Sequence, residues 1–589
     1  SKSEEEKEKI MAKILGFDLS KDDYLSLADS AFSKGETEKS ITYLDKALAL
    51  DARFVDASIA RSMVYASLGA WDISNATLFK SLARHPSQDD QGRIFYQLAV
   101  NFADLNMPDV AEYYLRDIQD AYDIQIPDGF FDPPKEEGQF KVVYPRGEDY
   151  YETLIAQAYE LVRDRKFDEA IRVVDEIPRG AKCKGAANHV VLVSLMMKND
   201  VDSVIANAQK MLQEDGDNLA VKCALATAYL MEEKMTEAYA ALDDILKKEY
   251  DRIEDILMIL PLIVNLEEHA QVVKYTKKVL ANADLQQNMM LWLSQGLYNL
   301  GQKEEAKKVM HRVRTVFGEL SPADYYLDLY ATDPENVAYS MGLPYVEKIA
   351  RYKLLDAFLK LSPADIAVLL DSEDKDAKEL KKIIDWAFVD DNEKLKLLII
   401  DRLAMVRCAW AEDFVREQLI SVDLSFDLAS RLIFCLMPEN RFRFSFDVVA
   451  QDRFKSINVT LPRAYFKLPS VLHAAVEYCI ADIVYTDEEP NIYLAALTDV
   501  VNSIVSLDDN GKLKYALSSG HKISAMKSMK TLVGVLLCKV YEEDGPDMRE
   551  VTLERYGLAE KTFDKYYKIV FGGEDEIQDK DGEYDDKQL

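Results

Sequence analysis

The sequence predicts an all-α protein, in which a right-handed superhelical solenoid of helix pairs precedes a mainly helical C-terminal domain. Three observations predict this fold. Eight segments between Lys21 and about Phe317 align with a period of 34 residues. Two positions of that period, twelve residues apart, carry small side chains in most segments. Beyond residue 318 the apolar residues keep helical spacing but lose the period. Such self-similarity is typical of stacked helix pairs that bury their apolar faces against one another.

The first three segments form one predicted block over residues 21–123. The first segment begins after Ser20, which has Asp23 three residues later, the arrangement of a capping box. Gly35 stands at its expected turn between two helices. The second segment follows directly from residue 55, and the third fits after a short insertion. Each segment is therefore expected to fold as a helix, a tight turn and a second helix.

Five further segments fit a second block over residues 149–317. The test of the alignment is the pair of positions where two helices approach too closely for large side chains. On the first helices these are Ala28, Ser62, Ala99, Ala158, Leu192, Ala226, Leu260 and Ser294. On the second helices they are Ser40, Ser74, Ala111, Ala170, Val204, Ala238, Val272 and Ala306. Six of eight are small in each set, and the same two segments break both, which indicates two degenerate but real units. The alternative is a generic amphipathic array on which the period has been imposed.

One residue disturbs the pattern within the second block. Pro261 lies inside the first helix expected for the seventh segment. A proline inside a helix removes one backbone hydrogen bond and clashes with the preceding turn. We therefore expect a kink or a shift of register at this position.

These segments resemble the tetratricopeptide repeat (TPR) family. In the first segment the resemblance is carried by Tyr24, Leu27, Ala28, Ala31, Gly35, Ser40, Leu44 and Ala47. It covers about half of the chain, and it implies a fold rather than a particular function. In this family the first helix of each unit lines a concave groove that binds proteins, so the resemblance implies groove residues at fixed offsets. These are Leu25, Asp29, Phe32, Ile59, Met63, Tyr96, Tyr159, Arg163, Met196, Met197, Leu230, Met231 and Tyr298.

The chemistry of these groove candidates indicates the class of partner. The Lys and Asn set with which chaperone-binding members of the family hold a terminal carboxylate is absent. What remains is aromatic and rich in methionine, with acid near the start, and methionine adapts to irregular apolar surfaces. We therefore expect a protein or peptide partner that is apolar or amphipathic and has basic character.

Four other segments complete the predicted organisation. Residues 1–20 form a charged N-terminal segment, and residues 124–148 form a loop rich in proline and glycine. The loop is expected to pack back on the solenoid, or alternatively to lie across the groove as a ligand of its own chain. Residues 318–572 form the C-terminal module, with helix starts at Ser321 and Ser362 and an alternating pattern that predicts a β-hairpin within 441–461. Residues 573–589 form an acidic tail that is expected to be disordered.

Composition restricts the function further. The formal net charge of −32 opposes non-specific binding to nucleic acid and to anionic membranes. Six cysteines without CxxC spacing favour a reducing, cytoplasmic location. No apolar run approaches the ~20 residues that a membrane-spanning helix needs. The acidic protein is thus expected to be cytoplasmic and to have no membrane partner.

No catalytic chemistry is indicated by the motifs. The sequence lacks GxxxxGK[ST], HExxH and GxSxG, and its histidines are isolated. We therefore predict no catalytic residues, no metal ligands, no cofactor and no enzymatic activity. The favoured function is that of a scaffold or adaptor for protein–protein interaction through the concave groove.

The alternative is a regulatory protein whose C-terminal module contacts nucleic acid. It rests on a basic and aromatic run from Arg441 to Lys467, and on a segment resembling a helix-turn-helix that carries Lys561, Lys565 and Lys568. The acidic tail that follows argues against nucleic acid. A contiguous positive face with Arg441, Arg443, Lys455 and Lys467 would favour this alternative, whereas burial of the Phe442 and Phe444 rings would favour the scaffold.

Overall fold

The computed structural model describes most of the chain. The described residues are 19–119, 148–177, 183–214, 216–282, 285–390, 392–406, 408–421, 424–438, 440–517, 522–523, 526–542 and 545–572. The predicted acidic tail, the 124–148 loop except for residue 148, and the predicted N-terminal segment except for Leu19 and Ser20 lie outside the described residues.

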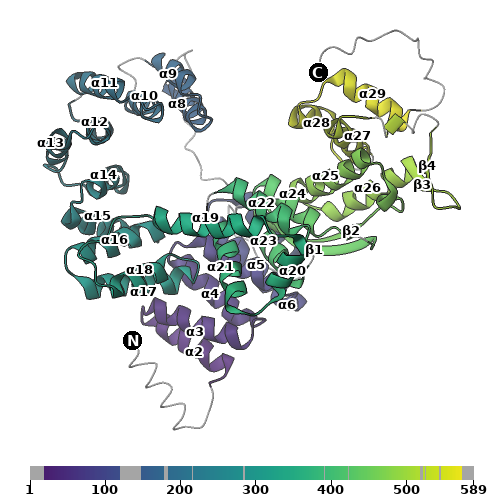
Figure 1. Ribbon diagram of the computed structural model, residues 1–589, viewed down its shortest axis with the longest axis horizontal. Coiled ribbons are helices and arrows are strands. Elements are labelled where there is room, and N and C mark those ends of the chain that lie inside the picture. The colour runs from purple at the N-terminus through teal and green to yellow at the C-terminus, as the bar shows by residue number, and fades with distance from the viewer. Residues whose placement is uncertain are drawn as a thin grey trace.

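The first block consists of three antiparallel helix pairs (Figure 1). Its helices are α2 (Lys21–Ser33), α3 (Thr37–Leu50), α4 (Val55–Ser67), α5 (Trp71–Leu82), α6 (Gln88–Asp104) and α7 (Pro108–Gln119). The predicted capping box is present at the start of α2: Asp23 N–H donates to Ser20 Oγ over 3.2 Å, and Ser20 N–H donates to Asp23 Oδ2 over 2.9 Å.

The second block is an arc of five helix pairs. Its helices are α8 (Glu148–Arg163), α9 (Phe167–Asp175), α10 (Lys184–Met197), α11 (Val201–Glu214), α12 (Leu219–Met231), α13 (Met235–Ile245), α14 (Ile253–Asn265), α15 (His269–Asn282), α16 (Gln287–Asn299) and α17 (Lys303–Phe317). The first helices α10, α12 and α14 lie on the inside of the arc, and α11, α13 and α15 on its outside (Figure 1).

The predicted close contacts hold every pair together. All sixteen close-packing residues are at most 1% exposed, including the larger Leu192, Val204, Leu260 and Val272. In the second pair the hydroxyls of Ser62 and Ser74 lie 2.8 Å apart, and in the eighth Ser294 Oγ donates to the Ala306 carbonyl over 2.8 Å. Small residues at these positions let two helices pack closely enough for such contacts.

A left-handed residue ends the first helix of every pair. The eight residues are Gly35, Gly69, Asn106, Arg165, Asn199, Glu233, Glu267 and Gly301, with φ between 56° and 78°. In each pair the following N–H donates to a carbonyl five residues earlier, as Gln302 does to Leu297 over 2.9 Å, which closes a Schellman motif. The same left-handed turn occurs at one offset in all eight units, which excludes an imposed period. The described residues from 21 to 317 therefore form an all-α solenoid.

The expected register shift at Pro261 does not occur. Helix α14 runs through Pro261, which is exposed at its surface. Leu260 is fully buried at its close-packing position, and Glu267 forms the left-handed turn at the usual offset. The missing hydrogen bond therefore falls on an exposed side of the helix and leaves the contact with α15 in register.

The solenoid core extends past residue 317, where the sequence placed its end. Helix α18 (Ala323–Ala331) packs on α17, and Tyr326 and Tyr330 are buried in the same cluster as Leu291 and Met310. The helix start expected at Ser321 is also wrong by one position. Pro322 takes the cap position, and the Ser321 hydroxyl donates to the Gly318 carbonyl over 2.7 Å instead.

The C-terminal part contains helices around two small hairpins. Its elements are α19 (Tyr345–Leu359), α20 (Pro363–Asp371), α21 (Lys375–Val389), α22 (Glu393–Leu403), α23 (Ala409–Leu419), α24 (Phe426–Cys435), β1 (Arg443–Ala450), β2 (Arg453–Thr460), the 3-10 turn η1 (Tyr465–Lys467), α25 (Ser470–Thr486), α26 (Pro490–Ile504), β3 (Val505–Leu507), β4 (Leu513–Tyr515), α27 (Met529–Tyr541), α28 (Arg549–Tyr556) and α29 (Glu560–Phe571). Ser362 caps α20 with Pro363 at its first turn. Strands β1 and β2 pair antiparallel, with Phe446 opposite Ile457.

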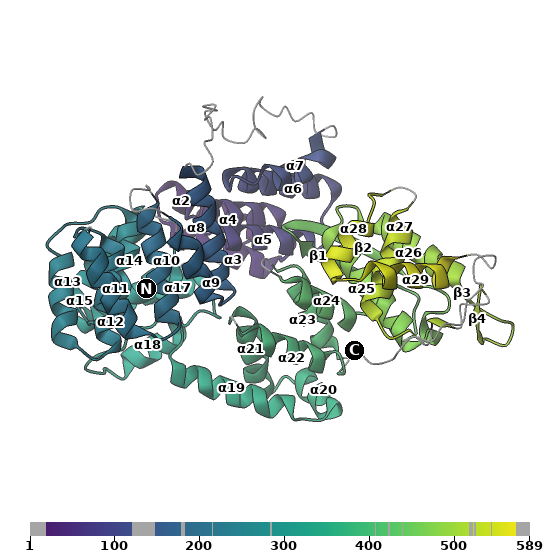
Figure 2. The ribbon, with the colours of Figure 1, turned by 90° about the horizontal axis from the view of Figure 1, so that it is seen from above.

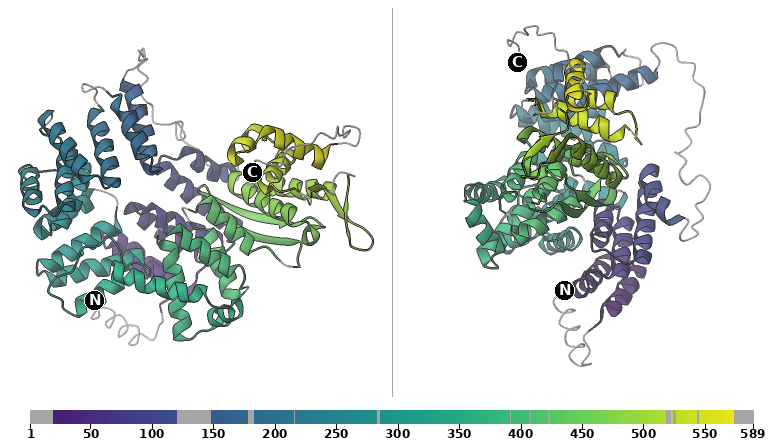
Figure 3. Two further views of the ribbon diagram at one scale, coloured as in Figure 1. Left: turned by 45° about the horizontal axis from the view of Figure 1, so that its top comes forward. Right: turned by 90° about the vertical axis from the view of Figure 1, so that its right-hand side faces the viewer.

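The first block lies between the second block and the C-terminal part (Figures 2 and 3). On one side Tyr65 Oη donates to the Val316 carbonyl over 2.9 Å, and Leu285 N–H donates to the Leu68 carbonyl over 3.0 Å. On the other side Tyr114 Oη donates to the Asp452 carbonyl over 2.7 Å and accepts from Phe454 N–H over 2.8 Å. The chain thus returns twice to the block with which it begins.

The left-handed turns give a prediction on stability. A side chain in this backbone region costs about 1–2 kcal/mol, which glycine does not pay, although glycine loses more entropy on folding. Glu267→Gly is therefore expected to raise the free energy of unfolding by about 0.5–1 kcal/mol. Chemical denaturation would measure it, with Gly301→Ala as the matched variant, which should change stability in the opposite direction. Equal signs for the two variants would contradict the assignment.

Candidate functional site

An extended segment of the chain lies in the groove of the last helix pair. We call residues 333–342 the strap. The Asn299 side chain on α16 brackets Val337: its Nδ2 donates to the Val337 carbonyl over 2.9 Å, and its Oδ1 accepts from Val337 N–H over 2.8 Å. Gln295, one turn earlier, holds Ser340 in the same way over 3.1 and 3.0 Å. These two amide side chains therefore donate hydrogen bonds to the strap backbone and accept hydrogen bonds from it, as a neighbouring strand would.

Apolar and aromatic contacts complete the strap site. Val337 is buried, and Tyr339 Oη lies 2.8 Å from His269 Nδ1. A Cβ at Gly296 would lie 3.0 Å from Val273 Cγ2 and 3.3 Å from Tyr339 Oη, so the absence of a side chain lets the strap approach α16. Burial raises the pKa of the Tyr339 hydroxyl, which therefore stays protonated at neutral pH.

Tyr298 was predicted to line the groove, but in the structure its side chain does not face an open groove. Its side chain is 1% exposed, stacked on Tyr330 with ring centroids 4.4 Å apart. Its hydroxyl donates to the Pro334 carbonyl over 3.0 Å. The strap and α18 cover this position of the last helix pair. The sequence contains no periodic signal for this cover, because the strap is a single extended segment without a repeat.

Upstream of the strap the groove of the second block carries exposed apolar side chains. Tyr159 lies four periods of 34 residues before Gln295, and Arg163, Met197 and Met231 lie four, three and two periods before Asn299. Tyr159, Met197 and Met231 are 43%, 59% and 44% exposed, and Arg163 is exposed as well. These side chains therefore occupy the positions that hold the strap in the last pair.

A cavity of about 460 Å³ marks this part of the groove. Its walls come from the first helices of four pairs, and the lining residues include Tyr159, Gly185, His189, Leu219, Ala220 and Met258. Tyr159 Oη lies 3.2 Å from His189 Nδ1. Burial lowers the pKa of His189, so its imidazole is neutral at pH 7 and the cavity is polar without being charged there.

The other groove candidates divide into exposed and half-buried residues. In the second block Met196 and Leu230 are half-buried and pack between neighbouring helices. In the first block Phe32, Met63 and Tyr96 are 39%, 51% and 49% exposed. Asp29 is also exposed, whereas Leu25 and Ile59 are half-buried. The first block thus presents an apolar face of its own, and the structure divides the predicted groove residues between two blocks.

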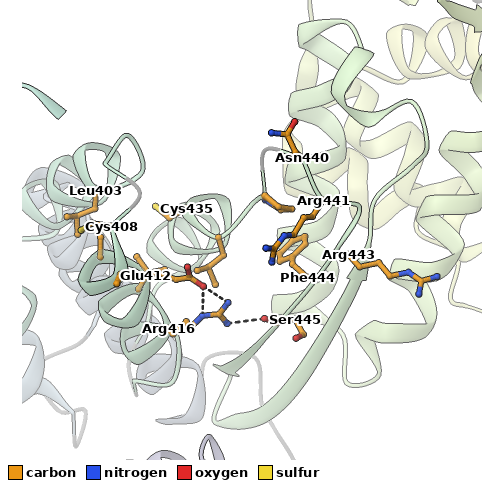
Figure 4. A pocket seen from close by; sticks show the side chains of 15 residues that line it. Leu403, Cys408, Glu412, Arg416, Cys435, Asn440, Arg441, Arg443, Phe444 and Ser445 are labelled. Carbon is orange, nitrogen blue, oxygen red and sulfur yellow. Dashed lines mark hydrogen bonds and ion pairs between the residues drawn. The ribbon is translucent and has the colours of Figure 1, made fainter. Parts of the chain in front are cut away.

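A cleft in the C-terminal part was not predicted from the sequence. It has a volume of about 650 Å³ and lies between helices α22–α24 and strand β1 (Figure 4). The Arg416 guanidinium spans it, bonded to Glu412 Oε1 over 2.8 Å and to the Ser445 carbonyl over 3.0 Å. Arg441 turns toward the Phe444 ring, and Arg443 extends to the other side of the strand (Figure 4). The alternating pattern of β1 and the basic and aromatic run that begins at Arg441 both pointed to this region, but neither predicted a cleft.

The positive face required by the nucleic-acid alternative is incomplete. Lys455 is 5% exposed, and its Nζ donates to the carbonyls of Val484 and Asp487 over 3.0 and 2.5 Å. Burial lowers the pKa of Lys455 to about 8. The Phe442 ring, however, is 44% exposed and packs edge-on against Phe466, so the burial expected for a pure scaffold is absent as well.

The segment that resembles a helix-turn-helix is a helix pair in the structure. Gly557 ends α28 in the left-handed conformation, and α29 follows. Arg549 on α28 pairs with Asp564 on α29 over 2.7 Å, and Arg555 pairs with the buried Asp482 over 2.8 Å. Lys561, Lys565 and Lys568 remain exposed. These arginines therefore serve packing within the C-terminal part.

Two searches of the described residues concern other kinds of site. They contain no group of three or more His, Cys, Asp or Glu side chains that could hold a metal ion. Among the described helices none has the length and apolar character needed to cross a membrane.

The clamp on the strap gives a second prediction. Asn299→Ala removes two hydrogen bonds to Val337 and should lower the free energy of unfolding by about 1–3 kcal/mol. It should also speed hydrogen exchange at the Val337 amide. The matched control is Asn265→Ala, one period earlier on an exposed face without the strap. Equal effects of the two substitutions would contradict a specific clamp.

Lys455 gives a prediction on pH. Its folded pKa of about 8 lies below the ordinary value of 10.5, so the unfolded chain binds more protons between these values. Burial of the charged Lys455 therefore lowers the stability of the fold by its full amount below pH 8, and this loss disappears as the pH rises through 10.5. The stability of the native chain minus that of Lys455→Met should therefore rise by up to about 3 kcal/mol over this window. Denaturation at a series of pH values would show it, and a flat difference would contradict the buried charge.

Comparison with known proteins does not assign this chain to a family, so the assignment of its fold rests on its own geometry. No family model matches the sequence, and no curated protein matches it. The solved structure of the APC/C hetero-tetramer Cut9-Hcn1 is similar at 12% identity over 71% of this chain and 97% of that chain, with a TM-score of 0.24. The structure of Naa15/Naa10 bound to HypK-THB is similar at 13% identity over 96% of both chains, with a TM-score of 0.17. Eight helix pairs with close contacts and left-handed turns at the same offsets identify the chain as a TPR-like helical repeat protein.

Proposed function

We propose that this protein is a non-catalytic scaffold or adaptor, which holds an extended segment of another protein in the concave groove of its second block. The observation that carries the proposal is the strap. It is an extended segment seated on α16 through backbone hydrogen bonds from Gln295 and Asn299. The seat of the strap on the last helix pair therefore supports the proposal that this groove accepts an extended segment.

The open groove upstream offers a different chemistry at the same positions. Tyr159, Met197 and Met231 replace the amide side chains, so apolar contact replaces backbone hydrogen bonding there. Glu232, Glu233 and Glu267 are exposed at the turns that follow α12 and α14. Apolar side chains with an acidic rim favour an amphipathic partner that has basic residues beside its apolar ones.

The surroundings of the thiols support the proposed location. Cys223, Cys408 and Cys479 are buried. Burial raises the pKa of Cys223 to about 12, which keeps this thiol protonated and unreactive. We propose a reducing compartment, the cytoplasm, in which such thiols need no protection.

The groove can be tested by site-specific photo-crosslinking in native cell extract. A photoreactive residue replacing Met197, on the first helix α10, is expected to capture a protein partner. The same residue replacing Lys210, which is exposed on the second helix α11, should capture none. Adding Tyr159→Ala and Met231→Ala to the Met197 probe should reduce capture about tenfold or more, since each removes an exposed apolar anchor.

The variants must first show the helical circular dichroism of the native chain. Equal capture from the Met197 and Lys210 probes would contradict binding in the groove. Capture that nuclease treatment removes would favour the alternative of nucleic-acid contact, for which the exposed Lys561, Lys565 and Lys568 on α29 are the remaining support.

A further inference from the structure

The hairpin β1–β2 has one edge that the fold covers. The outward-facing backbone groups of β2 belong to Ser456, Asn458 and Thr460. Asn458 N–H donates to Asn491 Oδ1 over 2.8 Å, and Asn491 Nδ2 donates to the Ser456 carbonyl over 3.0 Å. Thr498 Oγ1 donates to the Thr460 carbonyl. Side chains of α26 therefore occupy the outward-facing backbone groups of β2, so that no further strand can pair with this edge.

The edge of β1 is open. Register pairs Arg443, Ser445 and Asp447 with Thr460, Asn458 and Ser456, so their backbone groups point outward on the opposite side of the hairpin. Arg416 donates to the Ser445 carbonyl over 3.0 Å. Within the described part of the chain, the N–H groups of Arg443, Ser445 and Asp447 have no hydrogen-bond partner. Unpaired strand groups of this kind are a template for another strand.

At Arg443 and Ser445 the open edge faces the 650 Å³ cleft rather than bulk solvent. Helices α22–α24 form the opposite wall, and Leu403, Val415 and Leu436 give it an apolar lining. Figure 4 shows β1 and these helices on the two sides of the cleft. A strand added to β1 would therefore be paired on one side and packed on the other, which is the arrangement of β-augmentation.

Charge indicates what kind of segment fits. Arg441 and Arg443 are exposed, and neither forms an ion pair with any described acidic residue. In a chain of net charge −32, two free arginines beside one strand edge are an unusual local excess of positive charge. Glu412 is already bonded to Arg416 and offsets only that cation. The one acidic residue of the edge itself, Asp447, accepts from Ser456 Oγ over 2.7 Å and lies 3.6 Å from His85 Nε2, so its carboxylate already has partners of its own. The field at this edge attracts acidic residues, in contrast to the acidic rim of the groove.

We propose that β1 binds an extended acidic segment of a partner protein as a third strand of its sheet. The backbone of the segment pairs with Arg443, Ser445 and Asp447. Its carboxylates meet Arg441 and Arg443, and its apolar side chains face α23 and α24. This interaction surface is independent of the concave groove and takes a partner segment of opposite charge.

The test uses the full chain and a fluorescent heptapeptide of alternating valine and glutamate. Fluorescence anisotropy is expected to show saturable binding, and hydrogen exchange should slow at the amides of Arg443, Ser445 and Asp447. Two control peptides should not bind: one with lysine in place of glutamate, and one with alternate backbone amides N-methylated. Binding of the N-methylated peptide would overturn the proposal, because it cannot form strand hydrogen bonds.

Three variants separate the edge from non-specific charge. Ser445→Pro removes an outward N–H without touching the β1–β2 ladder and should abolish binding, while circular dichroism stays native. Arg443→Glu should weaken binding about tenfold or more by opposing the carboxylates. Lys467→Glu, an equal charge change on the exposed turn η1, should change it less than about twofold. Equal weakening by Arg443→Glu and Lys467→Glu would overturn the proposal.

Other occupants of the edge would give distinct results. Concentration-dependent dimers that Ser445→Pro abolishes would assign the edge to a second copy of this chain and overturn the proposal. Peptide binding that appears only after removal of residues 573–589 would assign it to the acidic tail, again against a partner protein. Binding to the full-length monomer is the outcome that supports the proposal.

Discussion

Close approach of two helices at one pair of small or tightly packed residues is the constraint on which this structure depends. The sixteen residues at these contacts are all at most 1% exposed. Each contact is possible only because the chain reverses at a left-handed residue a fixed distance away. Repeated eight times, the same reversal places every first helix on the same side of its pair. The groove, its lining and the seat of the strap all follow from that repetition.

The strap shows how one scaffold position serves two purposes. In the last pair, Gln295 and Asn299 hold the backbone of residues 337–340 and close the groove. The same offsets upstream carry Tyr159, Met197 and Met231, which leave the groove open and apolar. The repeat fixes where a side chain points, and the residue type decides whether that position holds the strap or stays exposed. The cleft beside β1 is not part of the repeat, and its arginines give it a charge opposite to that of the acidic rim of the groove.

Periodic features could be predicted from the sequence, and single contacts could not. The close-packing residues, the turn at Gly35 and the strands around Phe446 were predicted, because each leaves a spacing that the sequence repeats or alternates. Tyr298 was assigned to an open groove because its offset is right, but the strap that covers it has no period. Pro261 was expected to kink its helix or to shift the register, yet it falls on an exposed side of α14 and the register is kept. The cleft beside Arg416 depends on strands and helices that meet only in the folded chain.

The double return of the chain to its first block has a consequence for how the protein is made. Tyr114 and Phe454 are 340 residues apart in sequence, and Tyr65 and Val316 are 251 apart. At a synthesis rate of roughly 5–20 residues per second, Tyr114 leaves the ribosome roughly 17–70 seconds before its partner strand exists. Until Val316 has been made both faces of the first block are uncovered, and the face around Tyr114 stays uncovered until Phe454 follows. Contacts of such sequence separation also form slowly. Folding of this solenoid therefore cannot finish by simple growth from one end, because the first block, although it is made before both of its neighbours, is among the last parts to be fully enclosed.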